Sequence, residues 1–77
     1  MMSTDTKEDI MSVAKVTEII SSSPTSFDDA TAQGIRRASK TLKGIRNAWV
    51  ADQKVTVKDG EIDEYRVILK VTFVLDD

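Results

Sequence analysis

Residues 46–75, RNAWVADQKVTVKDGEIDEYRVILKVTFVL, carry the strongest structural signal in the chain. Asp59 and Gly60 lie near the middle, and both residue types tolerate the positive φ angles that a type I′ hairpin turn requires. β-Branched and aromatic residues are frequent on both sides of this pair, and the stretch contains no proline. The sequence therefore predicts a long hairpin with strands at residues 46–58 and 61–75.

The second of these strands alternates between two faces, as a strand with one buried side does. One face is uniformly apolar and consists of Tyr65, Val67, Leu69, Val71, Phe73 and Leu75. The other is mixed and consists of Ile62, Glu64, Arg66, Ile68, Lys70, Thr72 and Val74. We expect the uniformly apolar face to pack against a helix.

The half of the chain before the hairpin predicts a strand, a turn and a helix. Residues 12–21 are rich in Val and Ile and lack Gly and Pro, which is typical of a strand. The polar residues 21–26 follow, with Pro24 among them, and predict a turn. Ser26 and Asp29 resemble a capping box in which Asp replaces the usual Glu, so the helix should begin after Ser26.

Small or apolar residues then recur every three or four positions, the spacing of one helix face. They are Phe27, Ala30, Gly34, Ala38, Leu42 and Ile45. Lys40 and Lys43 suit a last helical turn, and Gly44 suits the position after a C-terminal cap. We therefore expect the helix to end near Lys43.

Together these elements predict an α+β fold of β-α-β-β order, a three-stranded antiparallel sheet wrapped on one helix. Residues 12–77 would form the single domain, and the polar, acidic residues 1–11 a disordered N-terminal tail. A domain of 77 residues is marginal alone, because it buries only about 60% of the surface of its unfolded chain. The sequence has no Cys and no His, which excludes disulfides and thiolate metal sites. Self-association, or a hard cation held by oxygen atoms, is left as a stabilising factor.

One helix covers only one face of the predicted sheet. An ideal two-residue turn pairs Lys58 with Glu61, and continuing this register places pairs of residues on the uncovered face. These pairs are Gln53 with Arg66, Ala51 with Ile68, Trp49 with Lys70, and Asn47 with Thr72. Val55, Val57 and Ile62 would also lie there. An exposed apolar patch of this kind is typical of an interface or a ligand site, so we expect a homo-oligomer.

The chain resembles the dodecins, small β-α-β-β proteins that assemble as hollow dodecamers. The similarity covers residues 12–76 and rests on the strand VAKVTEI at 13–19, the segment SSPTSF at 22–27, Arg37-Ala38 in the helix, and the ending YRVILKVTFVL at 65–75. The resemblance implies that the helix packs against the concave side of the sheet. It also implies a role in binding, storing or buffering a small ligand, without catalysis.

Flavin-binding dodecins stack paired isoalloxazine rings between symmetry-related Trp residues, and a Gln on the last strand binds the flavin edge. Carried over without gaps, the Trp position falls on Asn47 and the Gln position on Arg66. The resemblance therefore implies weak binding of riboflavin, FMN or FAD and a closer likeness to the calcium-type dodecins. Trp49 shares the predicted face with Asn47, and it is either a replacement stacking residue or an interface residue.

Three further residues share the predicted face with Asn47: Gln53, Glu64 and Lys70. We expect Glu64 to neutralise Arg66 there. Carboxylates that could bind Ca²⁺ are spread along the chain, at Asp28, Asp29, Asp52, Glu61, Asp63, Glu64, Asp76 and Asp77. None of them forms an EF-hand loop, so the sequence leaves the identity of metal ligands open.

Other function classes find little support. Arg36, Arg37, Lys40, Lys43 and Arg46 form a basic patch, but the net charge is −2 and no aromatic residues are interleaved with them, so we expect no nucleic-acid partner. A solvated helix face, or pairing with Asp28 and Asp29 of another subunit, explains the patch better. The sequence contains no Gly-rich phosphate loop and no nucleophile elbow, so we expect no enzymatic activity. No apolar run would span a membrane, and the polar N-terminus does not resemble a signal peptide, so we expect a cytoplasmic protein.

Overall fold

The hairpin predicted around Asp59 and Gly60 is present in the computed structural model, which describes residues 13–75. Strands β2 (Ile45–Lys58) and β3 (Glu61–Val74) are joined by these two residues, whose φ angles are 54° and 79°. Lys58 pairs with Glu61, as a two-residue loop requires. The predicted tail at residues 1–11 lies outside the described residues.

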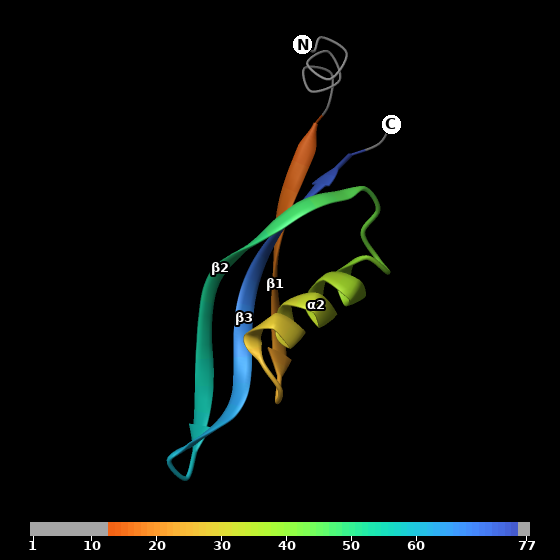
Figure 1. The fold of residues 1–77 in the computed structure, drawn as a ribbon. Coiled ribbons are helices and arrows are strands. Elements are labelled where there is room, and N and C mark those ends of the chain that lie inside the picture. Colours follow the sequence, from red (N-terminus) through yellow and green to blue (C-terminus); the bar gives the residue numbers. More distant parts are fainter. Residues whose placement is uncertain (1–12, 76–77) are drawn as a thin grey trace, which may run out of the picture.

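Strand β1 (Ala14–Ser23) and helix α2 (Phe27–Ala38) precede the hairpin, so the predicted β-α-β-β order is confirmed. The sheet is antiparallel and has the order β1-β3-β2, which makes β3 the central strand. Helix α2 crosses one face of this sheet, and the other face has no helix over it (Figure 1).

Helix α2 begins as predicted, with Ser26 as its N-terminal cap. The extended Ser26 accepts a hydrogen bond on Oγ from the backbone N–H of Asp29, at 2.9 Å. The carboxylate of Asp29 turns toward Ser23, whose Oγ donates to Asp29 Oδ2 at 2.6 Å. The same Ser23 Oγ accepts the backbone N–H of Thr25 at 2.9 Å. The fully buried Ser23 therefore completes the cap and ties the end of β1 to the helix.

The helix ends earlier than predicted, at Ala38. Ser39 caps it and donates its hydroxyl to the carbonyl of Ile35 at 2.8 Å. Lys40 then bonds back to Arg37 at the shorter i−3 spacing, which tightens the chain out of the helix. The last turn consequently carries Arg36 and Arg37, and the prediction of Lys40 and Lys43 in that turn is wrong.

Gly44 serves the start of β2 and is not a helix cap. Its φ is +74°, a conformation that favours glycine, and its carbonyl accepts the N–H of Val74 at 3.0 Å. An added Cβ would also lie 3.2 Å from the Val74 carbonyl oxygen. Gly44 thus has a backbone conformation that favours glycine, but it directly precedes strand β2 and does not follow a helix cap.

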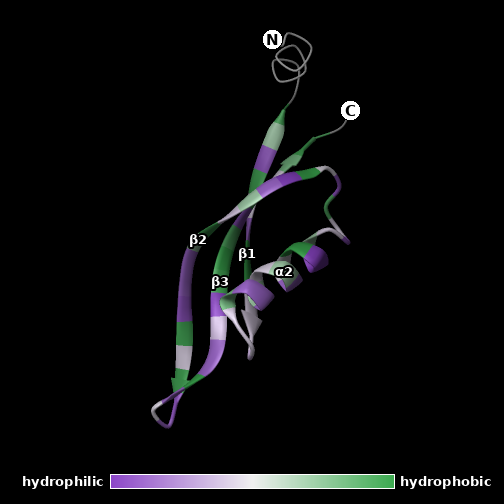
Figure 2. Ribbon diagram, in the orientation of Figure 1, coloured by the Kyte–Doolittle hydropathy of each residue, from purple (hydrophilic) through white to green (hydrophobic). Residues whose placement is uncertain are grey.

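The core lies between α2 and the predicted apolar face of β3. Val67, Leu69 and Val71 are buried there with Ala30 of the helix. Figure 2 shows an apolar segment in β3 beside the helix, whereas much of β2 is hydrophilic. Partly buried residues pack around this core: Ile19, Phe27, Ile35, Leu42, Ile45 and Ala48. Leu42 and Ile45 reach it from the connecting loop and from β2, so their predicted place on a helical stripe is wrong.

Candidate ligand-binding face of the sheet

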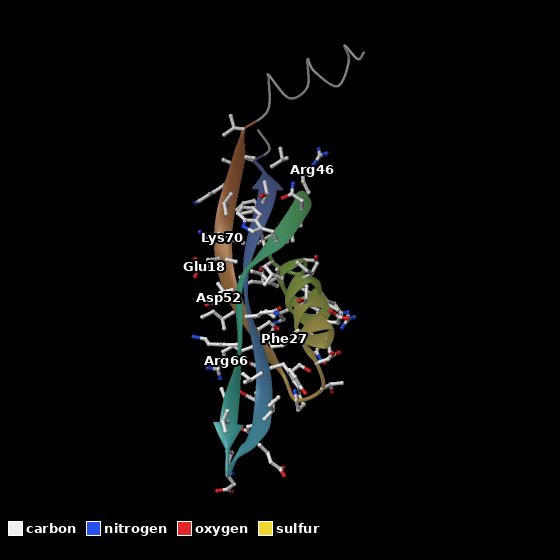
Figure 3. The ribbon with its side chains drawn as sticks, turned by 60° about the vertical axis from the view of Figure 1, so that its left-hand side comes forward. Glu18, Phe27, Arg46, Asp52, Arg66 and Lys70 are labelled. Atoms are coloured by element: carbon white, nitrogen blue, oxygen red, sulfur yellow. The ribbon has the colours of Figure 1, made fainter. Side chains whose placement is uncertain are left out.

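The sheet face turned away from α2, which we call the open face, carries the candidate ligand-binding residues. Figure 3 shows the side chains of Glu18, Asp52, Arg66 and Lys70 on this side. The strand register arranges the face in rows that each cross three strands: Glu18–Lys70–Trp49, Ile20–Ile68–Asp52 and Ser22–Arg66–Lys54. The open face therefore combines apolar side chains with both signs of charge.

Two of the predicted cross-strand pairs are confirmed. Trp49 lies opposite Lys70, and Asn47 lies opposite Thr72. Since directly opposite residues of an antiparallel pair share a face, all four lie on the open face. The structure thus brings Asn47 and Trp49 together with Lys70, as the sequence indicated.

The predicted position of Gln53 is wrong. Gln53 pairs with Val67, which is buried against the helix, and Lys54 takes the place opposite Arg66. The cause is a pair of β-bulges, because Asp63 on β3 and Ala51 on β2 have no partner in the register. Each of these bulges shifts the pairing by one residue, in opposite directions, so the predicted register returns from Val50 to Asn47 and shifts again only at Arg46, before Ile45.

The predicted places of several apolar residues are affected by the same bulges. Val55 pairs with Tyr65 on the helix side of the sheet, so it is not a residue of the open face. Ala51 is a bulge residue and has no partner, which contradicts its predicted pairing with Ile68. Val57 pairs with Ile62 and follows Val55 by two residues on β2, so the predicted place of this pair on the open face is also wrong. Their side chains are 65% and 51% exposed.

Arg66 is held by two neighbours on the open face. Its Nε donates to Ser22 Oγ at 3.0 Å, and its terminal nitrogen donates to Glu64 Oε1 at 3.1 Å. The expected neutralisation of Arg66 by Glu64 is therefore found within one chain. Both side chains keep more than a third of their surface exposed, so the ion pair is of the weaker, solvated kind.

Trp49 is 47% exposed and stands at the border of a groove between α2 and β2. The groove measures about 350 Å³, and its lining is mostly apolar. Ile35, Asn47, Ala48, Val50 and Leu69 contribute to it along with Trp49. One indole therefore adjoins both this groove and the open face.

A metal site is not complete within the described part of one chain. Over residues 13–75, no three Asp or Glu side chains come close enough together to hold a metal ion. Asp76 and Asp77, two of the predicted candidates, lie outside the described residues. Ca²⁺ takes six to eight oxygen ligands, and no cluster of carboxylate side chains within residues 13–75 supplies that many.

The predicted basic patch divides into two parts. Arg36, Arg37 and Lys40 line a shallow pocket of about 190 Å³ with Gln33. Arg46 lies instead in the wall of the groove beside Trp49.

No helix within residues 13–75 is long and apolar enough to cross a membrane.

Four residues lie on the open face without having been predicted there: Glu18, Ser22, Asp52 and Lys54. Glu18 and Ser22 enter it because β1 pairs with β3, and strand order had not been assigned from the sequence. Asp52 and Lys54 enter it through the two bulges. Alternation along β1, with Val16, Glu18 and Ile20 on one side, was the signal available for the first of these residues.

Comparison with known proteins agrees with this architecture. The family model described as Dodecin matches residues 13–76. The calcium dodecin of Mycobacterium tuberculosis is 41% identical over 63 residues, which cover 82% of this chain and 89% of the relative. The structure of the dodecin from Streptomyces davaonensis superposes with a TM-score of 0.82 and 36% identity, covering 86% of this chain and 97% of that one.

The crystal structure of the Mycobacterium tuberculosis calcium dodecin, a calcium-chelating antigen with a novel calcium-binding site, is also similar. It gives a TM-score of 0.74 and 40% identity, and covers 83% of this chain and 91% of that one. The matched family model, these identities and the shared β-α-β-β fold all lead to one conclusion: this chain belongs to the dodecin family.

Proposed function

We propose that the chain is the subunit of a homododecameric, non-enzymatic protein that binds, stores or buffers a small ligand and has only a weak flavin site. Membership of the dodecin family and 41% identity to a calcium dodecin support this assignment. The observation that carries it is the state of Arg66, whose guanidinium is already bonded to Ser22 and Glu64. A cytoplasmic location stays part of the proposal on the sequence argument alone.

Arg66 occupies the position where the flavin-binding members of the family carry Gln. An amide offers both a donor and an acceptor to the flavin edge, whereas a guanidinium only donates. A flavin bound there would have to compete with Glu64 for these donors. Asn47, at the position of the stacking Trp, offers no ring surface for the isoalloxazine.

Self-association is supported by what the single chain leaves exposed on the open face. The side chains of Val16, Ile20 and Trp49 are 48%, 64% and 47% exposed there. Burial of such apolar surface contributes roughly 25 cal/mol for each Å² removed from water, so a second copy on this face would stabilise a marginal domain.

Calcium is the ligand that the similarity to the calcium dodecin favours. Since no three carboxylates come together within residues 13–75, we place the proposed calcium site between subunits, where each chain contributes one or two side chains. Assembly and calcium affinity should then be linked, since a cation bound between subunits stabilises only the assembled form.

A second candidate function is flavin storage with Trp49 as the stacking residue. Its support is the position of Trp49, half-exposed on the open face beside the Asn47 position. The two candidates differ in the ligand and share the assembly.

Light scattering after size exclusion tests the assembly, with an expected mass of about twelve times the 8.5 kDa of the chain. Calorimetric titration of the chelator-treated protein with CaCl₂, and with MgCl₂ as the control cation, tests the ligand. We expect a saturable heat with CaCl₂ and a weaker one with MgCl₂. A mass of one chain would refute the assembly, and equal or absent responses to the two cations would refute the calcium assignment.

A further inference from the structure

The end of the β2–β3 hairpin projects beyond the rest of the fold (Figure 1). The last partner of β1 on β3 is Tyr65, so residues 56–64 pair only within the hairpin. We call these residues the hairpin arm. It leaves the molecule elongated, with extents of 55 × 25 × 15 Å.

The hairpin arm carries an apolar pair within an acidic surface. Val57 and Ile62 lie directly opposite each other and are 65% and 51% exposed. The arm contains four carboxylates and the single cation Lys58. Glu64 is paired with Arg66, which leaves Asp59, Glu61 and Asp63 without an ion pair within residues 13–75. A two-stranded segment with exposed apolar side chains is marginally stable in water unless it packs on another surface.

A groove of complementary character runs between α2 and β1. It measures about 490 Å³, and Ile19, Gly34 and Ala38 give it apolar walls. Gln33 and Arg37 line it as well, and both also belong to the basic pocket of about 190 Å³ next to it. We call this surface the helix groove.

Within residues 13–75, the basic side chains beside the helix groove form no ion pair with a carboxylate. The pair Arg66–Glu64 is the single ion pair found among residues 13–75, so Arg36, Arg37 and Lys40 form none there. The hairpin arm holds unpaired carboxylates but lies at a separate end of the molecule from the C-terminal half of α2 (Figure 1). These opposite charges therefore do not meet within residues 13–75 of one chain.

We propose that the hairpin arm of one subunit docks into the helix groove of a second copy. Val57 and Ile62 would enter between the apolar walls, and the arm carboxylates would meet Arg36, Arg37 and Lys40. The contact joins two different surfaces, so it is head-to-tail and closes a ring of subunits if the rotation allows. This inference rests on the proposed assembly and specifies one of its interfaces.

Charge reversal with rescue tests the contact. Arg37→Glu and Asp63→Arg should each reduce or abolish the dodecamer peak in size exclusion with light scattering, because like charges would then face each other. The double variant Arg37→Glu/Asp63→Arg should restore the peak. Lys15→Glu, which changes the net charge by the same amount at the far end of β1, should leave it unchanged.

The competing partner for the basic residues is the first helical turn of another subunit. The double variant Arg37→Glu/Asp28→Arg should therefore fail to restore the dodecamer. Rescue by Asp28→Arg, or an unchanged mass for both single variants of a dodecameric wild type, would overturn the inference and leave the proposed function intact. A monomeric wild type would overturn both.

Cross-linking gives a second measurement that does not depend on the stability of a variant. The chain contains no Cys, so a pair of introduced thiols has no competitors. Ile62→Cys on the arm and Thr41→Cys in the groove, placed in one chain, should form a ladder of covalent oligomers on oxidation. Each single variant should give dimers at most. Absence of species larger than dimers from the assembled double variant would contradict the proposed contact.

Discussion

Trp49 of β2 lies directly opposite Lys70 of β3, on the sheet face that the helix leaves open. Glu18 of β1 lies opposite the same lysine from the other side, so an indole, an ammonium group and a carboxylate form one row across the sheet. The apolar ring lies at one end of the row, the ammonium group lies in the middle, and the carboxylate lies at the other end. Such a surface suits contact with a second protein surface better than intercalation of a planar ligand.

We expect weak flavin binding for this reason. Riboflavin titrated into the protein should lose little fluorescence, and the double variant Asn47→Trp/Arg66→Gln should bind about tenfold more tightly or better, since stacking and edge recognition each add about 1 kcal/mol. Asn47→Leu/Arg66→Gln is the control without an added ring, and it should gain only the contribution of edge recognition, about fivefold in affinity.

One more variant in the same titration distinguishes the two candidate roles of Trp49, flavin stacking and subunit contact. If the wild type quenches riboflavin strongly and Trp49→Leu abolishes the effect, Trp49 is the stacking residue and the second candidate function holds. If Trp49→Leu instead reduces the dodecamer peak and leaves flavin binding weak, the indole belongs to the subunit interface.

The sequence predicted the elements and the hairpin register well because turn chemistry and alternation are local properties. It predicted the pair Trp49–Lys70 even though two bulges separate that pair from the turn, because the two shifts cancel. Gln53 lies between the bulges and was therefore misplaced. No residue type marks Ala51 or Asp63 as a bulge, since most side chains are tolerated there.

The helix end was mispredicted because the apolar spacing of the helix continues beyond its last residue, Ala38. Leu42 and Ile45 continue the apolar spacing of the helix, but they pack on the core from the loop and from β2. The functional roles of Asn47, Trp49 and Arg66 stay predictions, since they depend on contacts between subunits. Interfaces between copies are not determined by the local patterns of one chain.

The close approach of α2 to the sheet predicts an effect at Gly34. A Cβ added there would lie 2.9 Å from Leu69 Cδ1 and 3.0 Å from Ser21 Cβ. Gly34→Ala gains about 1 kcal/mol of helix propensity but costs about 1–3 kcal/mol in overpacking, since the core side chain and β1 must both shift. We expect a net loss of about 1 kcal/mol in the free energy of unfolding, measured by urea denaturation.

The matched control for this prediction is Ala32→Gly, on the exposed side of the same helix. It isolates the Gly-to-Ala propensity difference, and it should destabilise the protein by about 1 kcal/mol. A Gly34→Ala variant that is more stable than the wild type would mean that the helix moves away from β1 without cost.

The cap of α2 predicts a pH-dependent stability. Hydrogen bonds from Ser23 and then from Gln33 lower the pKa of Asp29, because both favour the charged carboxylate. A folded-state pKa below that of the unfolded chain means that the unfolded state binds more protons as the pH falls. The stabilisation is therefore full above the unfolded-state pKa of about 3.9 and is lost as the pH drops through the lower folded-state value.

Thermal denaturation at pH 7 and pH 3 measures this linkage. The difference in melting temperature between the wild type and Asp29→Asn should be largest at neutral pH and should shrink in acid. Asp28→Asn, next to it in the first turn, is the control, because Asp28 makes no side-chain hydrogen bond within residues 13–75. An Asp29→Asn effect of equal size at both pH values would show that the charge itself contributes nothing.

Arg66 predicts a stability effect that does not depend on any ligand. Arg66→Ala removes the hydrogen bonds to Ser22 Oγ at 3.0 Å and to Glu64 Oε1 at 3.1 Å. The loss should be about 1 kcal/mol per chain, because the pair is partly exposed and its Coulomb energy is screened by water. Lys54→Ala is the control, since Lys54 lies opposite Arg66 but forms no ion pair within residues 13–75.

Melting temperatures with and without FMN or inorganic phosphate distinguish an internal ion pair from an anion site. When Glu64 neutralises Arg66, an added anion finds no unpaired guanidinium there, so the wild type should melt at the same temperature in both buffers. Arg66→Ala should then melt lower than the wild type by a similar amount in each. A wild type that melts markedly higher with FMN or phosphate, and an Arg66→Ala variant without that response, would identify the open face as an anion-binding site, because only a group that binds the folded state shifts its melting temperature.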